Sequence, residues 1–398
     1  MSQEAVMGPA APSPSRARLE ELFVRLARLP SPSRAEREVA DCVAAFLRAL
    51  GLEVSEDEAG KCLNGDTGNL YCLVRGEGDT PVFALGTHLD TVAPQGHIEP
   101  VVGPDGVFRN IHETILGADD KCAIAAVLHA TELLVGSGHS FPTYELIFSV
   151  CEEIGLQGAK HLPEGVLRSP MAAVLDSSGP VGGIVVKAPG QNCIRGLFKG
   201  LAAHAGVEPE RASNAIQAAS RALAAMRLGR LDEETTANIG IIRGGVATNI
   251  VPDRCEVEGE CRSHDEEKLA QVAAEMVDAL QLAAASTGVD VEVQLVHEYS
   301  AFALSARQPA VRLAEAAVSA AGLKPELLSA GGGSDANVLN ARGIPTVNLA
   351  AGMMRVHSPE EFVSLDDIER LCAVVLNLVR LAPLYAIRRG GAGEQVNA

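Results

Sequence analysis

Histidine and carboxylate residues follow short apolar stretches at several separate places in this chain. They stand at the ends of predicted strands or at the start of a predicted helix: His88, Asp90, Asp119, Glu152, Glu153, Asp176 and His357. In an open α/β sheet, ligands bind at the carboxyl ends of the strands. Two histidines with several carboxylates are a ligand set for a pair of zinc ions with water between them. This convergence predicts a metal-dependent hydrolase.

His88 and Asp90 are two residues apart at the end of the predicted strand PVFALGTHLD, so their side chains point to the same side. One side chain can bind a metal ion while the other orients that ligand, although a polar turn would explain the pair equally well when taken alone.

Asp119 and Asp120 follow Gly117 and precede an apolar helix. A single Asp there usually caps the helix, whereas two exceed that need and leave one for another role.

Glu152 and Glu153 follow an apolar strand, and adjacent strand-end residues point apart. One is therefore expected to bind metal, and the other to act as an unligated general base near the water. Asp176 precedes a turn and His357 lies in a loop. Each of these two is commonly a turn or surface residue, and only the joint placement of all these groups favours metal binding.

Bulk properties limit the function classes. The 398 residues suit two domains, and 47% are hydrophobic while only 3% are aromatic. A formal net charge of -18 repels nucleic acid and anionic membranes, so neither is an expected partner. Nine cysteines without a C-x-x-C pair predict reduced thiols in a cytoplasmic protein. No apolar run reaches the roughly 18 residues of a membrane span.

The order of predicted elements divides the chain into a domain and an insert. Residues 1–190 and 299–398 alternate helices with near-continuously apolar strands, which predicts a mixed, mostly parallel sheet flanked by helices. Residues 191–298 read strand, helix, strand, strand, helix, strand, the order of a split-βαβ insert. Residues 1–16 and 388–398 are expected to be flexible. Ser33 and Glu36 form a predicted capping box for a helix that ends near Leu50.

Several motifs occur in a fixed order along nearly the whole chain: GTHLDTV, LGADDK, CEEIGLQGAK, VLDSSG, HAGVEPE and VHSPEEF. Together they resemble the dizinc exopeptidase family of aminoacylases, carboxypeptidase G and peptidase T. HAGVEPE, GGGSDAN and the overall length are most similar to the peptidase T-like branch. The resemblance implies a zinc exopeptidase-like catalytic domain with an inserted ferredoxin-like lid that also forms a homodimer.

The resemblance also implies a role for each matching residue. His88 and Asp176 would bind one zinc ion, Glu153 and His357 a second, and Asp119 would bridge both, with a cis peptide bond to Asp120. Asp90 would orient His88, and Glu152 would be the general base. The substrate-facing residues implied for the lid are His204, Asn249 and Arg262. Mn²⁺ or Co²⁺ could replace Zn²⁺, because carboxylate-rich sites are not very selective.

The expected substrates are short peptides, above all tripeptides cut at the N-terminal bond, as the resemblance to peptidase T implies. Two alternatives remain open. The same chemistry would serve an amidohydrolase of N-acyl or N-carbamoyl amino acids, because sites rather than folds set function. The scaffold could also belong to a non-catalytic binding protein, although the presence of every ligand-type residue and of Glu152 argues against that.

Overall fold

The computed structural model describes residues 12–386, which divide into two compact units. Unit 1 holds the described residues up to Val186, Leu304–Ser329 and those from Ser334 onward, and unit 2 holds Lys187–Ala303 and Ala330–Gly333. The expected flexible segments 1–16 and 388–398 lie largely outside the described residues. Helix α1 (Arg16–Ala27) nevertheless begins inside the first of them, with Ser15 as its N-cap. Among residues 12–386, no helix combines the length and apolar character needed to cross a bilayer.

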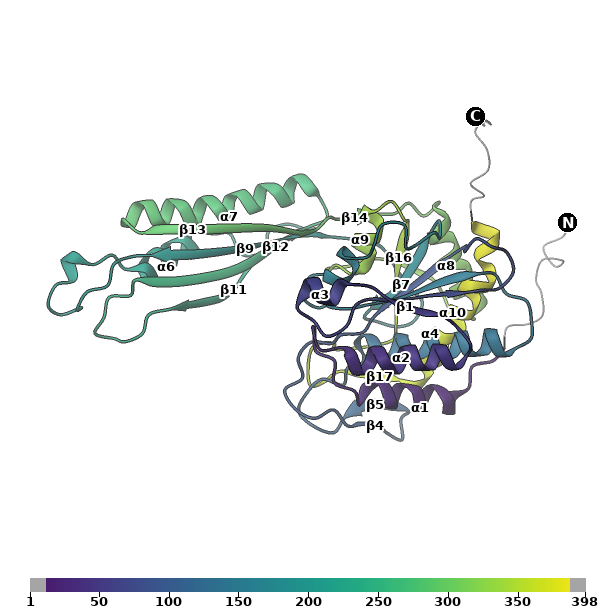
Figure 1. Cartoon of the computed structure of the whole chain (residues 1–398). Helices are drawn as coiled ribbons and strands as arrows, with labels where there is room; N and C mark the ends of the chain where they lie inside the picture. The colour runs from purple at the N-terminus through teal and green to yellow at the C-terminus, as the bar shows by residue number, and fades with distance from the viewer. Residues whose placement is uncertain (1–11, 387–398) are drawn as a thin grey trace, which may run out of the picture. The chain divides into compact units, whose positions relative to one another are not determined.

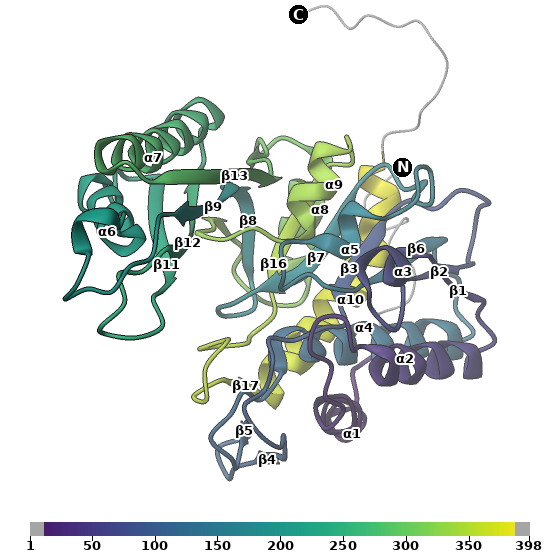
Figure 2. The same ribbon diagram turned by 60° about the vertical axis from the view of Figure 1, so that its left-hand side comes forward.

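The centre of unit 1 is a sheet of parallel strands. In the order β6 (Tyr144–Ser149), β3 (Ala84–His88), β7 (Ala172–Ser177) and β16 (Thr346–Ala350), neighbours pair in parallel. Every residue of β3, β6 and β16 is buried, as expected of apolar strands covered on both faces. Antiparallel strands extend the sheet at both sides (Figure 2), and the predicted fold class is confirmed. The flanking strands are β1 (Val54–Glu56), β2 (Leu70–Val74) and β8 (Gly183–Ala188), with β15 (Glu326–Ser329) beside β8. The two residues of β14 (Phe302–Ala303) belong to unit 2 and pair with Lys187 and Ala188 at the end of β8.

Helix α4 (Ala118–Gly136) is the central helix of unit 1 and packs against β3, β7, α1 and α10 (Leu365–Tyr385). Its buried surface is rich in small side chains, including Ala123, Ala125 and Ala126, which suits a core that contains few aromatic residues. The start of α4 is therefore held close to the ends of β3 and β7. The other helices of unit 1 are α2 (Arg37–Ala49), α3 (Ala59–Leu63), α5 (Gln157–Lys160), α8 (Pro309–Ala320) and α9 (Asp335–Ala341).

A small second sheet in unit 1 is not apparent from the sequence pattern. Strands β4 (Pro100–Val102), β5 (Val107–Asn110) and β17 (Phe362–Ser364) pair in the order β17-β5-β4. Each strand has only three or four residues, too few for a recognisable period. The pairing of β17 with β5 brings the chain after His357 close to the segment before Asp119.

Unit 2 is an antiparallel sheet carrying two helices (Figure 1). The strand order is β10-β11-β12-β9-β13, and α6 and α7 pack on each other and on the sheet around one apolar core. Apart from the two-residue β10, the elements follow the predicted strand and helix order of a split-βαβ insert. Their bounds are β9 (Gly190–Lys199), α6 (Ala215–Ala225), β10 (Gly229–Arg230), β11 (Thr235–Gly244), β12 (Arg254–Ser263), α7 (Glu266–Thr287) and β13 (Asp290–Tyr299), with a 3-10 helix at Pro209–Arg211.

The predicted capping box at Ser33 and Glu36 is wrong. Helix α2 begins at Arg37, and Glu36 at the N-cap makes no side-chain capping bond. Ser33 Oγ instead donates to Asp90 Oδ2 at 2.6 Å, and the fully buried Glu36 accepts from the backbone N–H of Cys151 at 3.0 Å. Both side chains therefore turn away from the helix and toward the ends of β3 and β6, where buried backbone groups need partners.

Candidate active site

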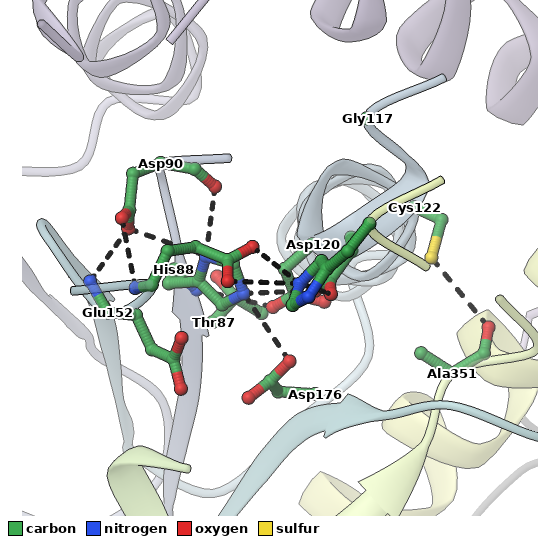
Figure 3. A network of polar contacts seen from close by, with 12 residues as sticks. Thr87, His88, Asp90, Gly117, Asp120, Cys122, Glu152, Asp176 and Ala351 are labelled. Atoms are coloured by element: carbon green, nitrogen blue, oxygen red, sulfur yellow. Dashed lines mark hydrogen bonds and ion pairs between the residues drawn. The ribbon is translucent and has the colours of Figure 1, made fainter. Parts of the chain in front are cut away.

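The carboxyl ends of three neighbouring parallel strands bring the predicted residues together. His88 is the last residue of β3, Glu152 and Glu153 follow β6, and Asp176 lies near the end of β7. His88 is in register with Ser149, so the β3 and β6 ends are level. Asp119 joins them from the start of α4, and His357 from the loop after β16. Figure 3 shows His88, Asp120, Glu152 and Asp176 gathered at this edge.

His88, Asp119 and Asp176 form a largely buried triad. The Nε2 atom of His88 lies 3.1 Å from Asp119 Oδ1 and 3.3 Å from Asp176 Oδ1. The other ring nitrogen, Nδ1, is 2.9 Å from the backbone oxygen of Asp90. An N–H bond from Nδ1 to that oxygen leaves the lone pair of Nε2 free to bind a metal ion.

Asp119, Glu153 and His357 form a second triad that shares Asp119 with the first. His357 Nε2 lies 3.3 Å from Asp119 Oδ2 and 3.0 Å from Glu153 Oε2. The two carboxylate oxygens of Asp119 thus face different histidines. Asp119 is therefore placed as a bridge between two cation positions.

Both triads fit divalent cations. The donor atoms within each triad all lie within 4.8 Å of one another. Oxygen and nitrogen ligands at about 2.0–2.2 Å from a tetrahedral zinc ion lie about 3.3–3.6 Å apart. The histidine–carboxylate separations of 3.0–3.3 Å are close to this spacing. Each triad supplies three protein ligands, which leaves a fourth position open, as in catalytic zinc sites.

The charges of the site also favour cations. Hydrogen bonds to Asp119 and Glu153 raise the pKa of His357 to about 10. Burial alone would lower the pKa of His88, but the charge of Asp176 and the bond to Asp119 raise it well above the ordinary value. Burial raises the pKa of Asp176 to about 7. The clustered carboxylates thus favour the protonated, positively charged form of both imidazoles. Two divalent ions would balance the same negative charge.

Asp90 supports both sides of the site. Its carboxylate accepts hydrogen bonds from the backbone N–H of Glu152 at 2.9 Å and of Glu153 at 3.1 Å. Its contact to His88 runs mainly through the backbone oxygen, since the carboxylate is 3.5 Å from Nδ1 (Figure 3). Asp90 therefore contacts the histidine and at the same time binds the turn that carries the two glutamates.

Glu152 and Glu153 diverge as the strand geometry predicts. Glu153 contacts His357, whereas the Glu152 carboxylate has no hydrogen bond or ion pair within residues 12–386. Burial, then the charge of Asp176, raises the pKa of Glu152 well above the usual range. In Figure 3 its side chain extends toward the side on which Asp176 lies. A buried, unpartnered carboxylate beside two cation positions can accept a proton.

Several further residues support the site through backbone contacts that the sequence pattern did not predict. Asp120, joined to Asp119 by a cis peptide bond, accepts from the backbone N–H of His88 at 3.2 Å. Asn348 Oδ1 accepts from the backbone N–H of Asp176 at 2.9 Å. Glu361 accepts three backbone bonds near Asp119, and only its place in the late VHSPEEF motif could have drawn attention to it.

The three predicted lid residues lie in unit 2, at two ends of its sheet. His204 and Asn249 are exposed neighbours, with Asn249 O accepting from the N–H of Ala205. Arg262 makes two hydrogen bonds to Glu260, at 2.9 and 3.0 Å. The register pairs Arg254 with Lys199 and Arg262 with Gln191, so Arg262 is at the strand end remote from His204. Unit 2 therefore does not gather these residues into one cluster.

Similarity to known proteins agrees with this geometry. Residues 84–381 match the peptidase family M20/M25/M40. The uncharacterized protein YqjE of Bacillus subtilis strain 168 is 38% identical over 365 residues, which cover 92% of this chain and 98% of that protein.

Two solved structures resemble the whole fold. The crystal structure of aminopeptidase PepT from Bacillus cereus ATCC 10987 is 36% identical with a TM-score of 0.82, covering 93% of this chain and 99% of that chain. A tripeptidase from Staphylococcus aureus subsp. aureus Mu50 is 34% identical with a TM-score of 0.86 and the same coverage. The chain therefore belongs to the metallopeptidases of family M20/M25/M40, in the branch that resembles peptidase T.

Proposed function

We propose that this metallopeptidase uses two zinc ions to remove the N-terminal residue from short peptides, with tripeptides as its main substrates. The observation that carries the proposal is the pair of His–carboxylate triads that share Asp119, with the unpartnered Glu152 beside them. The aminopeptidase and tripeptidase names of the two similar structures support the peptide substrate.

His88 and Asp176 would hold one ion, Glu153 and His357 the other, and Asp119 both. When bound, the ions would supply Lewis acidity that lowers the pKa of a water molecule and polarises the scissile carbonyl. Mn²⁺ or Co²⁺ would also suit the mixed oxygen and nitrogen ligands. Asp90 keeps His88 in the tautomer whose Nε2 faces the site.

Glu152 is the proposed general base and acid. Its carboxylate takes the proton of the attacking water as the water oxygen bonds to the carbonyl carbon. The same oxygen returns that proton to the amide nitrogen as the C–N bond breaks, so the amine leaves neutral. Backbone bonds to Asp90 fix the glutamate turn, so the base is positioned before substrate binds.

Unit 2 would supply the substrate-binding residues. Arg262 is proposed to bind the substrate carboxylate. Its Nε and Nη2 donate to Glu260. Its Nη1 lies beside Gly332, which as a glycine has no side chain to fill the space there. His204 is proposed to stabilise the oxyanion, with Asn249 as an amide donor. Cytoplasmic location is part of the proposal, supported by nine free thiols.

A homodimer through residues 191–298 is also proposed. Strand β13 pairs with β9 on one side, and among residues 12–386 no strand pairs with its other edge. Between the Arg254 and Arg262 ends, β12 spans about 26 Å at roughly 3.3 Å per residue. His204 and Arg262 of one protomer are thus far apart within unit 2, which supports a His204 that acts in the partner's site.

The two neighbouring glutamates should respond differently to the same isosteric change. Glu152→Gln cannot take a proton, and we expect a loss in kcat of about 10²–10⁴ with metal content unchanged. Glu153→Gln removes a charged ligand and should instead weaken binding of one ion. Steady-state kinetics with elemental analysis of both variants checks this. If Glu152→Gln loses metal while Glu153→Gln keeps it, the two roles are reversed.

End-capped peptides should separate a peptidase from an acyl-amino-acid hydrolase. With Ala-Ala-Ala as reference, an N-acetyl cap should abolish cleavage because the free α-amine is recognised. C-terminal amidation should lower kcat/KM by only about 10–100-fold, through loss of one charged hydrogen-bonded pair. Product analysis by chromatography gives both rates. Faster cleavage of the N-acetylated peptide would favour an amidohydrolase of N-acyl or N-carbamoyl amino acids.

Mixed dimers should test whether His204 acts across the interface. Glu152→Gln and His204→Ala protomers should each be nearly inactive as homodimers. Random pairing makes about half of the dimers heterodimers, and in each of them one of the two sites combines an intact Glu152 with the partner's intact His204. Co-expression should therefore restore about one quarter of wild-type activity. Sedimentation of the wild type should give twice the chain mass. An active monomer, or heterodimers without activity, would exclude a required partner His204.

A further inference from the structure

Glu361 is a buried carboxylate that contacts the backbone around the bridging Asp119. Only 2% of its surface is exposed. Its Oε2 accepts from the N–H groups of Leu116 at 2.7 Å and Gly117 at 2.8 Å, and its Oε1 accepts from the N–H of Asp119 at 3.0 Å. Hydrogen bonds to an ionised carboxylate are stronger than neutral ones, so three of them hold this loop firmly.

The same residue stands at the base of the loop that carries His357. Met354 and Phe362 exchange two backbone hydrogen bonds, of 2.9 and 3.0 Å, which close this loop. Glu361 directly precedes Phe362, and β17 then pairs with β5. Glu361 therefore connects the segment that presents His357 with the segment that presents Asp119, two ligands of one triad from distant parts of the chain.

A buried lysine at the start of α4 holds the same segment. Lys121 is fully buried, and its side-chain nitrogen donates to the backbone oxygen of Leu29. Burial lowers the pKa of Lys121 to about 7, while the charge of Glu361 acts in the opposite direction. Removing the negative charge of Glu361 would leave Lys121 without this nearby opposite charge. The Leu116–Lys121 segment is thus held by the hydrogen bonds to Glu361 and by the bond from Lys121 to Leu29.

We propose that Glu361 is a positioning residue, which holds the Asp119 carboxylate between the two histidines and keeps the His357 loop in register with it. The inference rests on the proposed metal-dependent function. Residues that orient metal ligands through hydrogen bonds typically contribute 10–100-fold to metal affinity or activity. Glu361 acts on the backbone of a ligand that both triads share, so its loss should affect both ions.

The substitution Glu361→Gln tests this with little change in shape. An amide has one oxygen, which can still accept hydrogen bonds from the N–H groups of Leu116 and Gly117. Its NH₂ group would then face the N–H of Asp119, and two donors cannot bond to each other. The bond that positions Asp119 is lost selectively. Glu145→Gln is a matched control. Glu145 is equally buried and accepts from the backbone of Arg168 and Ser169, but it contacts none of the proposed ligands.

Full-length protein stripped with a chelator would be titrated with Zn²⁺ by calorimetry, and the thermal unfolding of each metal-free variant recorded. Both substitutions should lower the unfolding temperature. Only Glu361→Gln should weaken Zn²⁺ binding, by about 10–100-fold. Wild-type affinity in Glu361→Gln, or an equal loss in Glu145→Gln, would overturn the proposal. If Glu361→Gln does not fold, Glu361→Asp, which keeps the charge and shortens the reach, is judged by the same criteria. A wild-type protein that binds no Zn²⁺ would instead refute the metal site itself.

Discussion

The shared position of the Asp119 carboxylate is the constraint on which the rest of the site depends. Its two oxygens face two histidines that come from opposite parts of the chain, His88 and His357. Such an arrangement requires the start of α4 to meet the ends of parallel strands, and the small buried side chains of α4 allow that close approach. Any displacement of this one carboxylate would disturb both proposed cation positions together.

Support for the site comes mainly from backbone hydrogen bonds to buried carboxylates. Asp90 binds the glutamate turn, Asp120 binds the backbone of His88, and Glu361 binds the loop around Asp119. Each of these carboxylates is buried, where a charge without partners would be costly. The side chains proposed as ligands are thus supported by a frame of backbone hydrogen bonds in addition to their mutual contacts, as preorganised catalysis requires.

Much of this was predictable from the sequence because strand ends and ligand types are local features. The apolar runs before His88, Glu152 and Asp176 predict parallel strands, and parallel strands place their last residues at one edge. Hydrogen-bond partners far apart in the chain are not a local feature, so the contacts of Glu361 with Leu116, Gly117 and Asp119 were not predictable. Ser33 and Glu36 show where a local pattern fails. Their spacing is that of a capping box, but their side chains instead bond to Asp90 and Cys151, which lie just after β3 and β6. The order of elements in unit 2 was predictable, but the separation of His204 from Arg262 emerges only from the strand register.

Anomalous diffraction from crystals grown with Zn²⁺ tests the central claim most directly. Data on both sides of the zinc absorption edge should show two peaks, one on each side of the Asp119 carboxylate. One peak should contact His88 and Asp176, and the other Glu153 and His357. A single peak at full occupancy, or two ions held by other residues with Asp119 unligated, would contradict a site built around a bridging carboxylate.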